Sequence, residues 1–164
     1  MKAGEILAFI DLSDSAGTRK IMIFTEGTIL KPKSWFLQYH FRSYLPIGDA
    51  VKKILNWQQQ GMDIVYCTSR RGQQARVIAD LLFKYRFPGS RLYFREHTQK
   101  YHHLVENIHP EILIEDDCKS IGGNWQMCIT HVDPLLKKEI HSIVVEEFKG
   151  IDQLPVSVEE LAAF

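Results

Sequence analysis

Short polar and acidic segments follow three apolar runs of this sequence. The apolar runs 21–24, 63–67 and 112–114 are followed by Thr-Glu-Gly-Thr at 25–28, Thr-Ser-Arg-Arg at 68–71 and Glu-Asp-Asp at 115–117. Carboxylates can hold a cation or move protons, and hydroxyl groups can hold the oxygens of an anion. If the three runs are neighbouring strands, hydroxyl groups, carboxylates and cations converge on one crevice.

The elements that would position these residues alternate between strands and helices. Seven short apolar runs are predicted as strands: Ile6–Ile10, Ile21–Phe24, Asp63–Cys67, Arg91–Phe94, Ile112–Ile114, Gln126–Ile129 and Ser142–Val145. Four segments with helical periodicity are predicted as helices: Ile47–Gln60, Gln73–Tyr85, Thr98–Ile108 and Pro134–His141. This alternation is typical of βαβ units and indicates a mostly parallel sheet, in which ligands bind at the carboxyl ends of the strands.

The predicted fold is one domain over residues 1–164, a three-layer α/β/α sandwich with a mostly parallel, doubly wound sheet. No Gly- or Ser-rich linker divides the chain. The aromatic residues of segment 29–45 follow no clean period, so this segment is either a small cap or lid or a surface helix packed on the core. Residues 155–164 are predicted as a short helix or a tail.

The composition excludes several classes of protein. The chain has 20 basic and 20 acidic residues, and this balance argues against nucleic-acid binding, which favours a basic excess. No apolar run approaches the roughly 20 residues that span a membrane. Three cysteines without a CxxC motif make structural zinc or a disulfide framework unexpected and favour a cytoplasmic location.

The strand-end segments resemble the haloacid dehalogenase (HAD)-like phosphohydrolase superfamily over about residues 20–145. The first motif of that family is a strand ending in Asp-x-Asp-Gly-Thr, and this chain has Phe-Thr-Glu-Gly-Thr at 24–28. The second, a strand ending in Ser or Thr, corresponds to residues 63–70, and the acidic fourth motif to residues 112–117. The best match to the lysine of the third motif is Lys100. The resemblance implies a doubly wound sheet and Mg²⁺-dependent phosphoryl transfer.

The resemblance also implies a role for each matching residue. A small phosphorylated metabolite would be the ligand and Mg²⁺ the cofactor. The catalytic residues would be Glu26, Thr68 and Lys100. Mg²⁺ would be bound by Glu26, Asp116 and Asp117. The phosphate group would be bound by Gly27, Thr28, Thr68 and Ser69. Taken alone, Lys100 is equally well explained as a solvated helix residue.

The first motif departs from the family at its most important position. Phe24 stands where active members carry the nucleophilic Asp, and its ring can neither attack phosphorus nor bind a metal ion. Glu26 keeps a carboxylate at the acid/base position. The leading hypothesis is that the site still binds Mg²⁺ and a phosphorylated ligand, with atypical or lost catalysis.

The sequence leaves three alternatives open. Asp11, after the apolar run 6–10, could be the nucleophile, with residues 20–24 as the following strand of a hairpin. Glu26 could instead activate water on a metal-bound substrate. A third reading is a non-enzymatic protein that keeps the fold to bind a metabolite or a partner, and an exposed aromatic cap would favour a homodimer.

Overall fold

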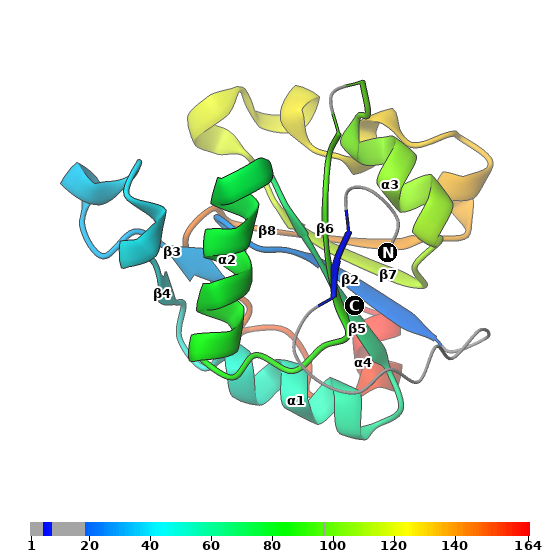
Figure 1. Cartoon of the computed structure of the whole chain (residues 1–164). Coiled ribbons are helices and arrows are strands. Elements are labelled where there is room, and N and C mark those ends of the chain that lie inside the picture. Colours follow the sequence, from blue (N-terminus) through cyan, green and yellow to red (C-terminus); the bar gives the residue numbers. More distant parts are fainter. Residues whose placement is uncertain (1–4, 8–18, 97) are drawn as a thin grey trace.

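A six-stranded sheet forms the centre of the computed structural model, which describes residues 5–7, 19–96 and 98–164 (Figure 1). The order of the strands is β1-β6-β5-β2-β7-β8, in which the last five are parallel to one another and β1 pairs antiparallel with β6. The predicted α/β fold with a mostly parallel sheet is therefore confirmed. The strands are β1 (Glu5–Leu7), β2 (Lys20–Phe24), β5 (Asp63–Thr68), β6 (Arg91–Phe94), β7 (Ile112–Asp116) and β8 (His141–Val145).

Two hydrophobic cores cover the two faces of the sheet and produce three layers. Successive side chains of a strand point to opposite faces, so Ile21 and Ile23 of β2 enter one core and Met22 enters the other. The first core also contains the apolar sides of three helices, and the second contains that of one helix together with short 3₁₀ turns. The helices are α1 (Ala50–Gln59), α2 (Gly72–Lys84) and α4 (Val158–Ala162) on the first face, and α3 (Tyr101–Ile108) on the second.

Two predicted elements are wrong, and both lie between β7 and β8. Residues 126–129, predicted as a strand, belong to a run of 3₁₀ helices (Gly123–Gln126 and Ile129–His131). The backbone N–H groups of Cys128 and Ile129 donate to the Glu115 carboxylate and are not used in a strand ladder. Segment 134–141, predicted as a helix, contains only the 3₁₀ helix Leu136–Lys138, because His141 already pairs with Ile112 at the start of β8.

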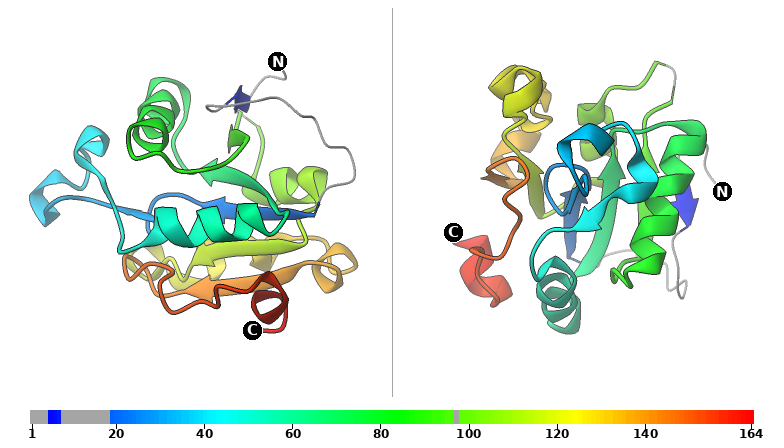
Figure 2. Two further views of the ribbon diagram at one scale, coloured as in Figure 1. Left: turned by 90° about the horizontal axis from the view of Figure 1, so that it is seen from below. Right: turned by 90° about the vertical axis from the view of Figure 1, so that its left-hand side faces the viewer.

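Residues 29–46, here termed the cap segment, form a small unit at one end of the sheet. It consists of the two-stranded pair β3 (Leu30–Lys31) and β4 (Leu45–Pro46), with the 3₁₀ helices Trp35–Leu37 and Phe41–Ser43 between them. The segment contains no α-helix, although Phe41 and Tyr44 pack into the first core, as the surface-helix alternative expected for its aromatic residues. Figure 2 shows the cap segment projecting beyond the end of the sheet at which β2 finishes.

One alternative predicted that the N-terminal strand and β2 form a hairpin, and this prediction is wrong for the described residues. β1 is an edge strand beside β6, whereas β2 lies at the centre between β5 and β7. Asp11, the alternative nucleophile, lies outside the described residues. At the other terminus, α4 confirms the predicted short helix, and Ser157 Oγ accepts a hydrogen bond from the N–H of Glu160 at its start. In the described part of the chain, no helix is long and apolar enough to cross a membrane.

Candidate functional site

The position of β2 determines where the site lies. From β2 the chain continues to β5 on one side and later to β7 on the other, so the carboxyl ends of these strands flank a point at which the strand order reverses. Open α/β sheets bind their ligands at such a point. A pocket of about 750 Å³ opens there, and its walls come from the strand ends, the cap segment, the start of α3 and the loop after β7.

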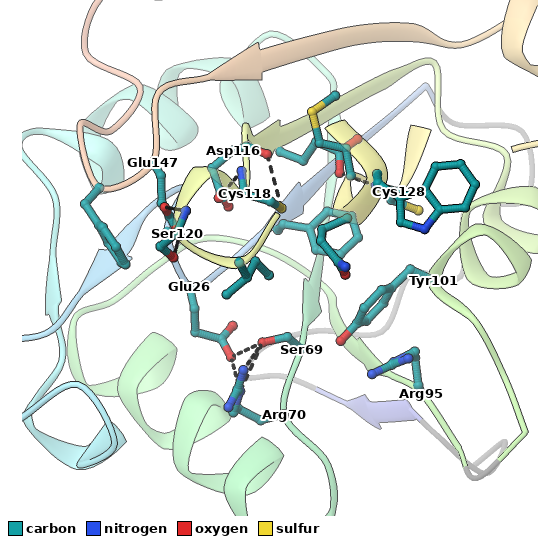
Figure 3. A pocket seen from close by; sticks show the side chains of 18 of the residues that line it. Glu26, Ser69, Arg70, Arg95, Tyr101, Asp116, Cys118, Ser120, Cys128 and Glu147 are labelled. Carbon is teal, nitrogen blue, oxygen red and sulfur yellow. Dashed lines mark hydrogen bonds and ion pairs between the residues drawn. The ribbon is translucent and has the colours of Figure 1, made fainter. Parts of the chain in front are cut away.

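The carboxylate of Glu26 is surrounded by hydrogen-bond donors (Figure 3). Thr68 Oγ1 lies 2.8 and 2.9 Å from its two oxygens, and Ser69 Oγ lies 3.1 Å from Oε1. Arg70 Nε forms an ion pair with the same oxygen at 3.2 Å, and the Thr25 hydroxyl also donates to Glu26. Since the side chain of Glu26 is only 11% exposed, protein groups neutralise and enclose this carboxylate.

Gly27 brings the β2 loop into contact with Asp116 at the end of β7. Its φ of +86° lies in the left-handed region, and a Cβ atom at this position would lie 2.7 Å from Asp116 Oδ1. The hydroxyl of Thr28 donates to the same oxygen at 3.1 Å, and the N–H of Cys118 donates to Oδ2 at 3.1 Å. The Gly-Thr sequence therefore fixes a buried carboxylate on the neighbouring strand.

Three carboxylates converge at the ends of β7 and β8. Asp116, Asp117 and Glu147 each offer an oxygen, and these oxygens all lie within 4.8 Å of one another. Asp117 Oδ1 accepts from the N–H groups of Lys119 and Glu147, and the Glu147 carboxylate accepts from the N–H and hydroxyl of Ser120. Among the residues that the structure describes, none of the three carboxylates forms an ion pair with a basic side chain.

This donor set fits a hard divalent cation. Mg²⁺ prefers oxygen ligands and is usually held by one or two carboxylates together with water and substrate oxygens. Burial raises the pKa of Asp116, and the nearby Glu147 carboxylate raises it further. A cation among the three groups would remove this repulsion, so the three carboxylates favour cation binding.

Glu115 belongs to the acidic motif but points to the other face of the sheet. It is 3% exposed, and its oxygens accept from the N–H groups of Cys128 at 2.6 Å and Ile129 at 2.9 Å. Burial raises the pKa of Glu115 to about 7, although these two hydrogen bonds partly oppose the shift. Its geometry indicates a structural role in anchoring the loop after β7.

An aromatic and basic wall faces the acidic residues. Phe24 packs edge-on against Tyr101, with 5.5 Å between the ring centroids. The guanidinium of Arg95 lies 4.0 Å from the centroid of the Tyr101 ring, and the two labelled side chains lie side by side in Figure 3. Arg95 Nε is buried and has no hydrogen-bond partner among the described residues. Lys100 also lines the pocket, at the N-terminus of α3, and its side chain is exposed.

The structure places the predicted site residues in two groups rather than one. Thr68 and Ser69 surround Glu26, whereas Thr28 and Gly27 contact Asp116. Of the predicted metal ligands, Asp116 and Asp117 lie together, and the third carboxylate of their cluster is Glu147 rather than Glu26.

Sequence reasoning did not find Glu147, Arg70 or Arg95. The same strand-end rule would have found Glu147, because it follows β8 as the other acids follow β7. Arg70 belongs to the segment that matches the second motif, but no individual role was predicted for it. No sequence pattern distinguishes Arg95, because its position depends on Tyr101 of the next helix.

Comparisons with known proteins support the fold. No family model and no curated protein matches the sequence. A chain in a structure of the Pnkp1/Rnl/Hen1 RNA repair complex is similar with a TM-score of 0.55 and 14% identity, over 90% of this chain and 47% of that one. A second structure of the Pnkp1/Rnl/Hen1 complex gives a TM-score of 0.53 and 14% identity, over 87% and 51%.

A further similar structure is that of a D,D-heptose 1,7-bisphosphate phosphatase from Burkholderia thailandensis, with a TM-score of 0.43 and 10% identity over 80% of this chain and 94% of that one. This chain spans about half the length of the two chains from the repair complex. The likeness to the two chains from the repair complex concerns the fold alone, a mostly parallel α/β sheet flanked by helices.

Proposed function

We propose that this chain is a phosphohydrolase-related domain that binds Mg²⁺ and a small phosphorylated ligand at the carboxyl ends of β2, β5 and β7. The observation that carries this proposal is the convergence of Asp116, Asp117 and Glu147 beside a pocket that is also lined by Arg95 and Lys100. An anionic ligand and a cation could both be neutralised there.

Mg²⁺ would be held by Asp116, Asp117 and Glu147. When bound, it would screen the negative charge of a phosphate group and orient its oxygens. The hydroxyl of Thr28 and the N–H of Cys118 hold the carboxylate of Asp116 in place, and Ser120 does the same for Glu147. Such preorganised carboxylates lose little conformational entropy when a cation binds.

The phosphate group would be bound by Arg95, with Lys100 as a second cation. The Nε–H of Arg95 is a buried donor without a partner among the described residues, and leaving such a group unpaired costs free energy. An anionic oxygen in the pocket would satisfy it. Thr68 and Ser69, predicted to contact phosphate, already direct their hydroxyl groups at Glu26, so their contribution would require Glu26 to move.

Phe24 and Glu26 favour ligand binding over covalent catalysis. Phe24 removes the aspartyl-phosphate route because its side chain is packed on Tyr101 and offers no nucleophile. The ion pair of Glu26 with Arg70 and its hydrogen bonds with three hydroxyl groups favour a structural role over water activation. These observations also support the second candidate function, a non-enzymatic protein that binds a phosphorylated metabolite.

Metal binding is tested by thermal unfolding with and without Mg²⁺. A ligand that binds only the folded state raises stability by mass action, so Mg²⁺ at millimolar concentration should raise the melting temperature. Asp116→Asn should abolish this shift. The matched control is Asp80→Asn, which changes an exposed acid on α2 and should keep the full shift. An unchanged melting temperature of the wild-type protein would contradict the metal proposal.

Catalysis is tested separately by phosphate release from a panel of phosphomonoesters in the presence of Mg²⁺. Turnover that disappears only in Glu26→Gln would support water activation by Glu26. Turnover that disappears only in Asp11→Asn would place the nucleophile after the first strand. If ligands bind without turnover in any preparation, the non-enzymatic function is favoured.

A further inference from the structure

We propose that the small phosphorylated ligand is a nucleoside phosphate, with its base stacked on Trp125 and its phosphate on Arg95. This inference rests on the proposed function of the same pocket and adds the class of ligand. It comes from the exposed aromatic side chains at the mouth of the pocket, which neither the metal site nor the phosphate site uses.

Two large aromatic rings line the pocket and yet remain open to solvent. Trp125, in the loop after β7, is 72% exposed, and Tyr39, in the cap segment, is 82% exposed. Aromatic side chains carry much apolar surface, and exposed apolar surface at a pocket marks a binding region. A ligand for these rings should itself carry a flat, partly apolar group. A nucleobase is such a group, and the sugar of a simple sugar phosphate is not.

Trp125 is held in place before any ligand arrives. The hydroxyl of Thr130 donates to the carbonyl oxygen of Asn124 at 2.6 Å, and His131 Nε2 lies 2.7 Å from the carbonyl oxygen of Trp125. The His131 ring also packs nearly perpendicular to the indole, with 5.0 Å between centroids. A ring fixed in this way loses little freedom on binding, which makes it a suitable stacking platform.

Ring contacts lead from Trp125 to His131 and His102, and the basic group lies beside the next residue of the same helix, Tyr101. His131 lies beside His102 with 6.1 Å between ring centroids, and Tyr101, the residue before His102, supports the guanidinium of Arg95. These residues join an aromatic surface at the mouth to a buried cationic donor deeper in the same pocket. A nucleoside phosphate has the same order of groups, with a base at one end and an anion at the other.

The size and charge of the site favour a free nucleotide over a nucleic acid. A pocket of about 750 Å³ lies within the range of small-molecule sites. Nucleic acids are bound through many phosphate contacts and need an excess of basic residues, whereas this chain has equal numbers of acidic and basic residues. Because every base has a flat face, stacking should show little preference among bases.

The experiment measures binding to the full chain by isothermal titration calorimetry in the presence of Mg²⁺. The probes are adenosine 5′-monophosphate (AMP), glucose 6-phosphate and a short oligonucleotide with a terminal phosphate. We expect AMP to bind more tightly than glucose 6-phosphate. Trp125→Ala should weaken AMP binding about tenfold, a typical effect of removing one stacking ring, and leave glucose 6-phosphate binding unchanged.

Two further variants serve as controls. Trp35→Ala removes an indole that is 69% exposed and does not line the pocket, so it should leave the affinity for AMP unchanged. Trp125→Phe keeps a stacking ring and should retain most of the affinity. A loss in Trp125→Ala that both controls lack would show that the ring itself binds the base.

The other outcomes separate this inference from the proposed function. Equal affinities for AMP and glucose 6-phosphate, unaffected by Trp125→Ala, would overturn the nucleotide assignment and leave the phosphate site intact. If neither phosphate ester binds, the proposed function fails as well. Tighter binding of the oligonucleotide than of AMP, with a steep dependence on salt, would overturn the choice of a free nucleotide.

Discussion

The two acidic regions of the pocket are neutralised in different ways. Between the ends of β2 and β5, a single carboxylate, that of Glu26, meets three hydroxyl groups and the guanidinium of Arg70. At the ends of β7 and β8, three carboxylates approach within 4.8 Å and accept hydrogen bonds from backbone N–H groups, Thr28 and Ser120. The first region carries its own cation, whereas the second has no basic side chain paired with it among the described residues.

This difference separates a structural carboxylate from carboxylates that can bind a ligand. A partly buried acid with an arginine partner is already compensated, and removing either partner leaves the other without compensation. Several acids without a basic partner repel one another, and an external cation would relieve that repulsion. The comparison predicts that substitutions in the first region change stability, whereas those in the second also change the response to metal ions.

The largest expected effect is that of Gly27→Ala, which disturbs the second region through the backbone. The left-handed φ of Gly27 would strain an alanine, and the added Cβ would overlap the buried carboxylate of Asp116. We expect a loss of about 4 kcal/mol in the free energy of unfolding, from backbone strain and overpacking together. Chemical denaturation measures this loss.

Gly61→Ala is the matched control for this substitution. Gly61 has a similar φ of +93°, but no atom lies within 4 Å of its added Cβ. Only the strain of the left-handed backbone remains, at about 1–2 kcal/mol. Equal losses in the two variants would contradict the contact between Gly27 and Asp116.

The sequence predicted β2, β5 and β7 well because each of these strands is a continuous apolar run. The apolar runs 21–24, 63–67 and 112–114 are buried on both faces, and this leaves a continuous hydrophobic pattern that does not depend on distant residues. Their parallel arrangement followed from the helices between them. The sequence therefore placed Thr68, Asp116 and the Gly27 loop near one another.

The loop after β7 could not be predicted in the same way. Segment 126–129 is as apolar as a short strand, and a buried 3₁₀ turn gives the same pattern. Its conformation depends on the Glu115 carboxylate, which is distant in the sequence. The separation of Glu26 from the cluster of Asp116, Asp117 and Glu147 likewise depends on which hydrogen-bond donors lie around each carboxylate. The spacing of residues along the sequence does not contain that information.

The carboxyl group of Glu115 should make the stability of the folded protein depend on pH. Its folded-state pKa of about 7 lies above its ordinary value of 4.5, so the folded protein binds more protons than the unfolded chain between these values. Stability should therefore fall as pH rises from about 4.5 to 7, by up to about 3 kcal/mol from this group. Glu115→Gln should lack this fall.

The pH effect is measured as the difference between wild-type and variant stability at each pH, with a chelator present. The difference removes the contributions of other titrating groups that both proteins share. A constant difference from pH 4.5 to 7.5 would mean that Glu115 has the same pKa in the folded and the unfolded protein, contrary to the shift.

Glu26→Gln tests the first region, in which Arg70 neutralises the carboxylate of Glu26. The substitution removes the charge that Arg70 compensates and leaves a partly buried guanidinium with a weaker partner. We expect a loss of about 1–2 kcal/mol in the free energy of unfolding and a normal Mg²⁺-dependent shift of the melting temperature. Glu111→Gln, in the exposed pair with Arg19, should cost at most about 1 kcal/mol.

A Glu26→Gln variant that loses its Mg²⁺-dependent shift would overturn the distinction between the two regions. Glu26 would then be a metal ligand in the metal-bound protein, as the sequence motif predicted. This result would require its carboxylate to leave Thr68 and Ser69, which would free both hydroxyl groups for a phosphate.

Thr28→Val, with an expected effect no larger than that of Glu26→Gln, removes one hydrogen bond to Asp116 and keeps the shape of the side chain. Losing a hydrogen bond to a buried carboxylate should cost about 1–2 kcal/mol of stability without metal. Mg²⁺ should recover part of this loss, because a cation neutralises the same carboxylate that the hydroxyl group supports. Thermal unfolding with and without Mg²⁺ gives both values. A larger Mg²⁺ shift in Thr28→Val than in the wild type would show that the hydroxyl and the cation stabilise one common group, whereas equal shifts would place the ion elsewhere.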